Sequence, residues 1–215
     1  MNIDEQIKIS ELVLAATEEF GFALAGGFAL NVQGIIDRQT KDIDAFTSNF
    51  DEDNFRKAKE STEQVLKDAG YEVTVKLSES WRCSMIVINP ASKNSIELDL
   101  AYYHRYKSVT QIEDIGPVLN MYDLAAGKVT ALWDRQFARD YIDVAAFIAK
   151  GTYSIQDLYT MLKDARPEAS LSEFAICLSR ANQWHKRYLE YGMTESEIDD
   201  LVKIFHDAAS SFSDS

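Results

Sequence analysis

Two aspartates separated by a single residue are the first feature of this sequence that suggests chemistry. Asp42 and Asp44 flank Ile43 in the run DIDAF, which predicts a β-strand over 42–46. Because side chains alternate between the two faces of a strand, both carboxylates lie on one face and Ile43 lies on the other. Two like charges this close repel each other, and a divalent cation with oxygen ligands is the usual compensation. The same spacing also occurs at solvated strand ends, so a metal site and an ordinary surface are both open interpretations of the pair alone.

A later strand carries a second pair of acids at the same spacing. Glu97 and Asp99 lie in the run SIELDLAYY, which predicts a strand over 95–103 with apolar residues on its opposite face. If this strand lies beside the 42–46 strand, Asp99 joins the first pair. Three carboxylates on adjacent strands can hold two Mg²⁺ ions, or Mn²⁺ in their place, about 4 Å apart, and such ions clamp the attacking and leaving oxygens in phosphoryl transfer. The three aspartates are therefore predicted metal ligands.

A pair of glycines precedes these aspartates by about fifteen residues. Gly26 and Gly27 end a strand predicted over 22–27 and open a helix predicted over 28–37. Small residues at such a junction let backbone N–H groups and the positive end of a helix approach an anionic phosphate. The alternative is a tight strand-to-helix turn without a ligand. If the glycine turn binds a phosphate beside the predicted metal-binding carboxylates, the two features together predict a nucleotide site.

The helix predicted to begin at Met121 has two cations within its apolar stripe. The stripe contains Leu124 and Leu132, and Lys128 and Arg135 fall inside it. One interpretation is a lysine with a buried stem and a solvated ammonium group, together with an arginine at the helix end. The other is that Lys128 neutralises the charge of a triphosphate.

The next predicted helix has carboxylates on a mostly apolar face. Asp140 and Asp143 share that face with Val144 and Phe147. Buried carboxylates need cationic partners, so they can also form a structural network that serves only the fold. The partners in such a network would be the nearby basic residues Lys128, Arg135 and Arg139.

The surrounding pattern predicts an α+β fold, with a small mixed β-sheet core flanked by helices and followed by a C-terminal helical bundle. Helices are predicted over 4–19 and 51–69, and an alternating strand over 71–77. The runs SMIVINP and SIELDLAYY predict an antiparallel hairpin. Everything from Met121 to Ser211 has helical spacing. This change in character predicts two domains.

The predicted domain boundary lies near Gly116–Pro117. We predict a sheet domain over 1–104, a connecting segment over 105–118 and a helical domain over 119–215.

Composition limits the classes of partner. The chain has 215 residues, 35 acidic against 22 basic side chains, and a net charge of −13. This charge disfavours broad DNA binding, because phosphate contacts need an excess of Lys and Arg. The two cysteines, Cys83 and Cys177, are too few for a disulfide framework and fit a reducing compartment. The sequence shows neither a membrane span nor an export signal, so we expect a cytoplasmic protein.

A basic and aromatic helix face lies further along the chain. It comprises Arg180, Trp184, Arg187 and Tyr188. Such a face can bind RNA through phosphate contacts and stacking. The interpretation we favour places Trp184 and Tyr188 in the bundle core, with the basic residues flanking it.

The order of these features resembles a known group of enzymes. The order of a glycine-containing turn, an Asp-x-Asp strand and an aspartate on a later strand resembles the polymerase-β-like nucleotidyltransferase superfamily. More closely, GGFALNVQGIIDRQTKDIDAF is similar to the glycine-rich element and R-x-T-x-D-I-D signature of AbiEii-like nucleotidyltransferases, the toxins of abortive-infection systems. Arg38, Thr40, Asp42 and Asp44 occupy the signature positions. The Gly-Ser usual in the superfamily is Gly-Gly here, which leaves only backbone donors.

Two later segments extend the resemblance. DLAAGKVTALWDR and RDYIDV are similar to the K-x-n-R and R-D-x-x-D elements that follow the sheet in AbiEii-like proteins. The family has an active-site lysine and aspartate there, which correspond by position to Lys128 and Asp140, with Arg135 and Asp143 as further members. The resemblance therefore implies a nucleotide site made of Gly26, Gly27, Arg38, Thr40, Lys128, Arg135 and Asp140.

The residues and the resemblance together predict a Mg²⁺-dependent nucleotidyltransferase. It would transfer a nucleoside monophosphate from an NTP to a hydroxyl and release pyrophosphate, with the nucleotide in a cleft between the sheet domain and the bundle. Asp42 and Asp44 would carry the metals, and Asp99 would deprotonate or orient the acceptor hydroxyl. Lys128 would hold the phosphates.

The resemblance leaves the acceptor open among a tRNA 3′ end, a protein hydroxyl and a small molecule. A toxin also implies a separate antitoxin as a partner. The alternative function is a catalytically inactive NTP-sensing or partner-binding module with the same fold. The presence of all three carboxylates and the lysine disfavours that alternative.

Overall fold

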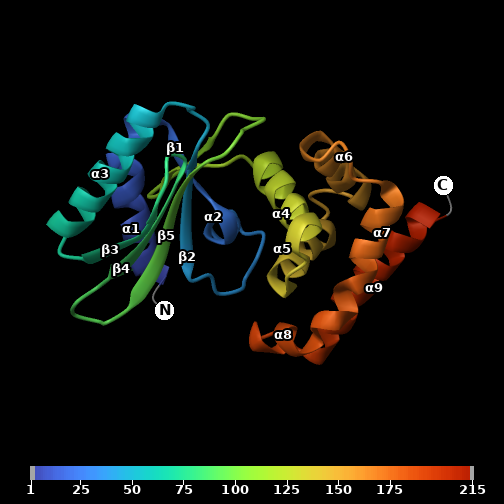
Figure 1. The fold of residues 1–215 in the computed structure, drawn as a ribbon. Helices are drawn as coiled ribbons and strands as arrows, with labels where there is room; N and C mark the ends of the chain where they lie inside the picture. Colours follow the sequence, from blue (N-terminus) through green and yellow to red (C-terminus); the bar gives the residue numbers. More distant parts are fainter. Residues whose placement is uncertain (1–2, 214–215) are drawn as a thin grey trace. The chain divides into compact units, whose positions relative to one another are not determined.

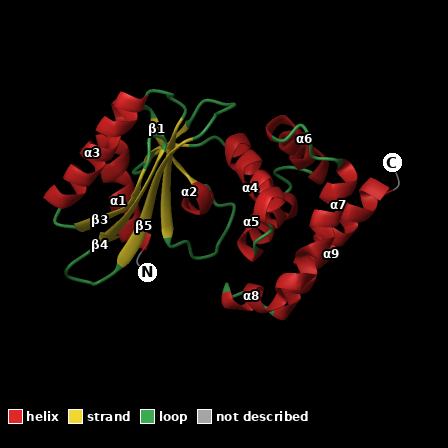
Figure 2. Ribbon diagram, in the orientation of Figure 1, coloured by secondary structure: helices red, strands yellow, loops and turns green. Residues whose placement is uncertain are grey.

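The computed structural model describes residues 3–213 and contains two compact units (Figure 1). The first unit comprises residues up to 33 together with 40–123, and the second comprises 34–39 together with 124 onward. The first unit contains the sheet, and the second contains helices (Figure 2). The fold class is α+β, as predicted.

The first unit contains a seven-stranded mixed sheet in the part of the chain that the structure describes. The strand order is β3-β4-β5-β2-β1-β7-β6, in which β2 pairs with β5 and β1 with β7 in parallel, and the other pairs are antiparallel. The elements of this unit are α1 (Ile3–Ala16), η1 (Glu18–Phe20), β1 (Phe22–Ala25), α2 (Gly26–Val32), β2 (Asp42–Thr47), α3 (Glu52–Asp68), β3 (Glu72–Ser78), β4 (Arg82–Ile88), β5 (Ser95–Tyr102), β6 (Thr110–Ile112) and β7 (Gly116–Val118).

Burial alternates along the two central strands that carry the predicted aspartates. On β2, Ile43 and Ala45 are buried, whereas Asp42 and Asp44 are partly exposed. The buried face is covered by α1 and α3, and α2 lies on the opposite side of the sheet (Figure 1). The alternation that the sequence predicts for DIDAF therefore follows from burying one face and leaving the other open.

Two local signals explain the bounds of α3. The side chain of Asp51 accepts a hydrogen bond from Asn54 N at 2.8 Å, which caps the first turn. Gly70, with a φ of +90°, follows the end of the helix in the left-handed region that favours glycine. The predicted range of 51–69 is confirmed to within a residue at each end.

The glycine pair begins a helix earlier than predicted. α2 starts at Gly26 and ends at Val32, so the predicted strand over 22–27 and helix over 28–37 are both wrong at their bounds. The reason is the backbone of Gly26, whose φ of +65° ends β1 and turns the chain at once into the helix.

The segment over 105–118, predicted as a connection, contributes two strands to the sheet. β6 and β7 form a short hairpin, and β7 pairs with β1 through Leu24 and Val118. Asp123 is 1% exposed and fixes the start of this segment by accepting hydrogen bonds from Tyr106 N at 2.7 Å and Lys107 N at 3.1 Å.

The second unit is helical. α4 (Met121–Arg135) begins at the end of the first unit and continues into the second, whose other elements are α5 (Ala138–Ala149), α6 (Ile155–Ala165), α7 (Leu171–Ser179), η2 (Arg180–Trp184), α8 (His185–Glu190) and α9 (Glu195–Ser213). Its core includes the fully buried aromatic residues Tyr141, Phe147, Phe174, Tyr188 and Phe205. None of the described helices is both long enough and apolar enough to span a membrane.

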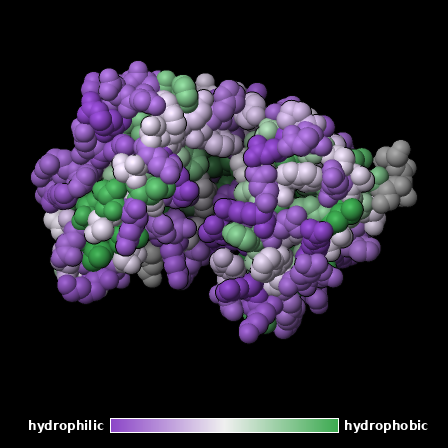
Figure 3. Space-filling model, viewed as in Figure 1, coloured by the Kyte–Doolittle hydropathy of each residue, from purple (hydrophilic) through white to green (hydrophobic). Residues whose placement is uncertain are grey.

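Of the two aromatic residues on the predicted basic face, Tyr188 is a core residue and Trp184 is partly exposed. Tyr188 is fully buried and donates a hydrogen bond from its hydroxyl to the Ala181 carbonyl at 2.8 Å. Trp184 is half-buried, and Arg187 is exposed and paired with Glu190. The favoured interpretation, core aromatics flanked by basic residues, is therefore confirmed for Tyr188, whereas Trp184 lies only partly buried at the edge of the core. The visible surface is largely hydrophilic, as the charge suggests, with a hydrophobic patch over strands of the first unit (Figure 3).

Candidate active site

The parallel pairing of β2 with β5 brings the predicted carboxylates together. Asp44 lies opposite Asp99, and Asp42 lies opposite Glu97. Residues paired across neighbouring strands point to the same face of the sheet, so all four acids share the face that α1 and α3 leave open. The strand that carries Asp99 thus lies beside the Asp-x-Asp strand, and the role of these aspartates as metal ligands stays a prediction.

The start of α2 lies directly against Asp44. A Cβ atom added to Gly26 would lie 1.7 Å from Asp44 Oδ2, well inside van der Waals contact. The φ of +65° at Gly26 also disfavours any other residue. Glycine at this position therefore allows the helix backbone to approach the carboxylate. Gly27 is the second residue of the same helix.

Asp99 has one oxygen engaged and one without a partner. Its Oδ2 lies 3.3 Å from Arg82 Nη2, whereas its Oδ1 is buried and has no hydrogen-bond partner among the described residues. A buried carboxylate oxygen without a partner is unfavourable unless a cation or a hydroxyl donor supplies one. This orphan oxygen therefore suits a metal ion or an acceptor hydroxyl.

The fit to a cation rests on residue type, strand register and this orphan oxygen. Within residues 3–213, no three acid, imidazole or thiol groups already form a cage that could hold a metal ion. Oxygen ligands are those that Mg²⁺ prefers, usually one or two carboxylates completed by substrate phosphates and water. Asp42, Asp44 and Asp99 match that kind of donor set.

Two residues of β4 share this face and were missed from the sequence. Ser84 lies opposite Asp99 and donates a hydrogen bond to Glu97 Oε1 at 3.3 Å. Arg82, two residues earlier on the strand, reaches Asp99 itself. The run SMIVINP predicted a strand beginning at residue 84, whereas β4 begins at residue 82, so Arg82 lay outside the prediction. Extending the alternating pattern of that strand by two residues toward its N-terminus would have included Arg82.

In the second unit, Lys128 and Arg38 converge on Asp143. The carboxylate of Asp143 is fully buried and accepts from Arg38 Nε and Nη2, each at 2.8 Å, and from Lys128 Nζ at 2.7 Å. Burial alone would raise the pKa of Asp143, but the charges and hydrogen bonds of Lys128 and Arg38 outweigh it and hold the pKa below its usual value. The buried ion-pair network that the sequence allowed as one interpretation therefore exists around Asp143.

A second buried pair involves Asp140 and Arg135. Asp140 is fully buried and accepts from Arg135 Nε at 2.9 Å and Nη2 at 2.8 Å, and also from Phe137 N at 3.2 Å. The last bond caps the N-terminus of α5. Both oxygens of Asp140 thus accept hydrogen bonds from groups of the protein itself. Thr40, the other signature residue, is buried in the first unit, and its carbonyl accepts from Gln6 Nε2 at 3.0 Å.

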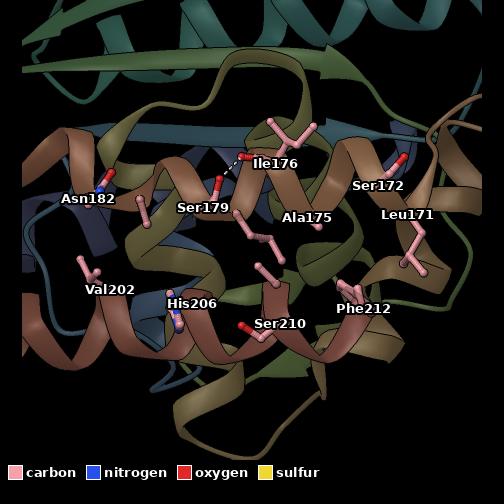
Figure 4. Close-up of a pocket in the computed structure, with 13 residues that line it drawn as sticks. Leu171, Ser172, Ala175, Ile176, Ser179, Asn182, Val202, His206, Ser210 and Phe212 are labelled. Atoms are coloured by element: carbon pink, nitrogen blue, oxygen red, sulfur yellow. Dashed lines mark hydrogen bonds between the residues drawn. The ribbon is translucent and has the colours of Figure 1, made fainter. Parts of the chain in front are cut away.

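Two cavities stand out among the described residues, and neither is lined by the carboxylate face. The larger, about 810 Å³, lies in the second unit between α7, η2 and α9 (Figure 4). Its side chains are mainly apolar, and His206 is its one ionisable residue among those described. The other, about 580 Å³, lies in the first unit beside Arg105.

No curated protein sequence matches the chain, but solved structures share its fold. Among solved structures, JHP933 from Helicobacter pylori is 17% identical, with 97% of this chain and 89% of that chain covered and a TM-score of 0.61. MenT4, a nucleotidyltransferase toxin from Mycobacterium tuberculosis H37Rv, is 14% identical, with coverage of 95% and 90% and a TM-score of 0.50. At these identities the likeness establishes the fold.

The family of this chain is established by a match to a protein-family model, not by similarity to individual relatives. The model described as the nucleotidyl transferase AbiEii toxin of type IV toxin–antitoxin systems matches residues 13–203, nearly the whole chain. This match includes the glycine pair, the Asp-x-Asp strand, Asp99 and the helices that carry Lys128 and Asp143. The chain therefore belongs to the AbiEii nucleotidyltransferase toxin family.

Proposed function

We propose that this nucleotidyltransferase transfers a nucleoside monophosphate from an NTP to a hydroxyl acceptor, with two divalent cations on Asp42, Asp44 and Asp99. The observation that carries the proposal is the pairing of Asp44 with Asp99 on neighbouring parallel strands, beside the partnerless oxygen of Asp99. Mg²⁺ is the expected ion and Mn²⁺ a substitute. Bound there, the ions supply positive charge that stabilises the attacking and leaving oxygens.

The protein's own groups have separate tasks in this reaction. Asp42 and Asp44 bind and place the cations, and Gly26 lets the backbone at the start of α2 come close to Asp44. Asp99 orients the acceptor hydroxyl and accepts its proton. The bond from the acceptor oxygen to the α-phosphorus forms as the bond from that phosphorus to the pyrophosphate oxygen breaks. Pyrophosphate leaves, and the proton stays on Asp99 until solvent removes it.

The phosphate contacts are proposed from the family resemblance. The backbone N–H groups of Gly26 and Gly27, the side chains of Lys128, Arg135 and Arg38, and Thr40 are the groups assigned to the nucleotide. Within the second unit, Asp143 fixes the direction of Lys128, and Asp140 fixes that of Arg135. We therefore assign Asp140 and Asp143 as positioning residues for these cations, since their oxygens already accept hydrogen bonds from protein groups.

The acceptor is proposed to be a tRNA 3′ end, a protein hydroxyl or a small molecule. The net charge of −13 favours an acceptor that is recognised locally over one bound along a broad surface. Membership of a toxin–antitoxin family also supports a cognate antitoxin as partner. A neighbouring reading frame for a small helix-turn-helix protein would be the expected genetic context.

The test is transfer from each labelled NTP, with Mg²⁺, to separate tRNA, protein and small-molecule fractions of a cell extract. We expect label in one fraction and release of pyrophosphate, both abolished by Asp42→Asn and by EDTA. Asp53→Asn, an exposed aspartate on α3, is the matched control and should retain activity. Full transfer by Asp42→Asn would overturn the mechanism. Binding of NTP without pyrophosphate release from any fraction would favour the NTP-sensing module.

A further inference from the structure

Arg82 faces the carboxylates from the neighbouring strand. It is the first residue of β4, which pairs antiparallel with β5, and it lies on the same face as Ser84, the residue opposite Asp99. Its Nη2 atom is 3.3 Å from Asp99 Oδ2. The Arg82 side chain is 56% exposed, whereas that of Asp99 is 21% exposed. The guanidinium therefore reaches a half-buried acid from the solvent side.

The contact between Arg82 and Asp99 lies in a part of the sheet where acidic residues outnumber basic ones. The strands β2, β4 and β5, which the structure describes in full, carry four acidic residues and one basic residue, Arg82. The four acids share one face with it. Like charges on one face repel, and a nearby cation relieves the repulsion. Arg82 supplies such a charge beside Asp99.

The contact is also of a kind that a stronger ligand can displace. The pair is exposed, the distance is long for a charge-assisted hydrogen bond, and one nitrogen alone makes the contact within the described residues. Asp99 Oδ1 stays without a partner while Arg82 holds Oδ2. A divalent cation can therefore use Oδ1 before or as the guanidinium moves away.

We propose that Arg82 is a resident counter-cation that makes the site select a cation–nucleotide complex over a bare cation. The proposal rests on the proposed function, because it takes the carboxylates to be metal ligands. The positive charge of Arg82 beside the carboxylates opposes the entry of a bare divalent ion. It attracts the complex of that ion with a nucleoside triphosphate, because the complex is negative overall and its phosphates suit the guanidinium fork. The metal then arrives with its substrate.

The test compares the binding of Mn²⁺ alone with that of Mn²⁺ and a non-hydrolysable α,β-methylene NTP by titration calorimetry. For Arg82→Gln we expect Mn²⁺ alone to bind about tenfold more tightly and the Mn²⁺–nucleotide complex about tenfold more weakly, since a unit charge acts over a short distance at a protein surface. Arg82→Lys keeps the charge and should restore both affinities to within a fewfold of the parent protein.

Arg56→Gln is the matched control. Arg56 on α3 is also an exposed arginine paired with a carboxylate, Glu60, and its removal should change neither affinity. If Arg82→Gln leaves both affinities unchanged, or weakens both equally, while Asp99→Asn abolishes binding, the role of Arg82 is refuted and the proposed function stands. If the parent protein binds neither Mn²⁺ nor its nucleotide complex, the proposed function fails, and this inference fails with it.

Discussion

Asp44 Oδ2 occupies the space that a side chain on Gly26 would need. Asp44 lies on β2 opposite Ala25, the last residue of β1, and Gly26 follows Ala25 as the first residue of α2. The glycine thus serves two purposes at one point: it accepts a positive φ, and it lets the helix that follows begin against a carboxylate of the site.

Replacing Gly26 with alanine is expected to damage both the fold and the site. The new methyl group would collide with Asp44, and the backbone would be strained at a φ of +65°, so we expect a loss of roughly 2–4 kcal/mol in the free energy of unfolding and a fall in nucleotide transfer of at least tenfold. Gly70→Ala is the control, because Gly70 also has a positive φ but has open space around it. Urea unfolding should show a loss of only about 1 kcal/mol for that variant, with transfer unchanged. Equal effects of the two substitutions would contradict the steric argument.

Asp143→Asn is expected to destabilise the second unit strongly. The substitution keeps the size of the side chain and removes the charge, which leaves Arg38 and Lys128 buried without their counter-ion. Breaking a buried pair in this way typically lowers the free energy of unfolding by about 3–5 kcal/mol. Asp134→Asn removes a carboxylate from the exposed pair with Arg166 and should lower it by less than about 1 kcal/mol. Denaturant titration measures both, and similar small losses would show that Asp143 is not the anchor of the network.

The contribution of Asp143 should depend on pH in a defined direction. Its pKa in the folded chain lies below the ordinary value of 3.8, so the folded protein holds this carboxylate ionised more readily than the unfolded chain does. The stabilisation is therefore complete above about pH 5 and is lost as the pH falls through the folded-state pKa. We expect the stability gap between the parent protein and Asp143→Asn to be constant from about pH 5 to 8 and to narrow below about pH 4. A gap that widened on acidification would show the opposite sign of the pKa shift.

Neither cysteine should react while the protein is folded. Burial raises the pKa of Cys177 to about 11 and also raises that of Cys83, and both thiols are buried. Because the thiolate is the reactive species, Ellman's reagent at pH 8 should label neither thiol under native conditions and both after unfolding in denaturant. Rapid labelling of one thiol in the native protein would indicate local opening of its unit.

The sequence predicted best those features that depend only on the alternation of side chains along one strand. DIDAF and SIELDLAYY alternate between buried apolar residues and open acids, so the shared face of Asp42, Asp44 and Asp99 could be predicted once the strands were assumed to be neighbours. Local strand patterns contain no information about which strand pairs with which. That adjacency comes from the parallel pairing of β2 with β5, which the structure supplies.

Other features depended on contacts between distant parts of the chain. The hairpin of β6 and β7 has strands too short to show a period, and β7 is held by its pairing with β1. The bonds of Lys128 and Arg38 to Asp143 were open to two interpretations, since a helical pattern shows that a cation lies in an apolar stripe but not what it touches. Arg82 was missed because a strand boundary was placed two residues too late.

The strand order has a consequence for when the carboxylate face can form during synthesis. Asp44 is made early, but its neighbour Asp99 lies on β5, and β1 gains its second neighbour only when β7 has been made. Parallel pairs between strands far apart in the sequence form slowly, because closing the long intervening segment costs entropy before the strand contacts compensate for it. The nascent chain therefore carries its Asp-x-Asp strand without the third aspartate until most of the first unit has left the ribosome. The carboxylate face is therefore complete only after β5 has been synthesised and has paired with β2.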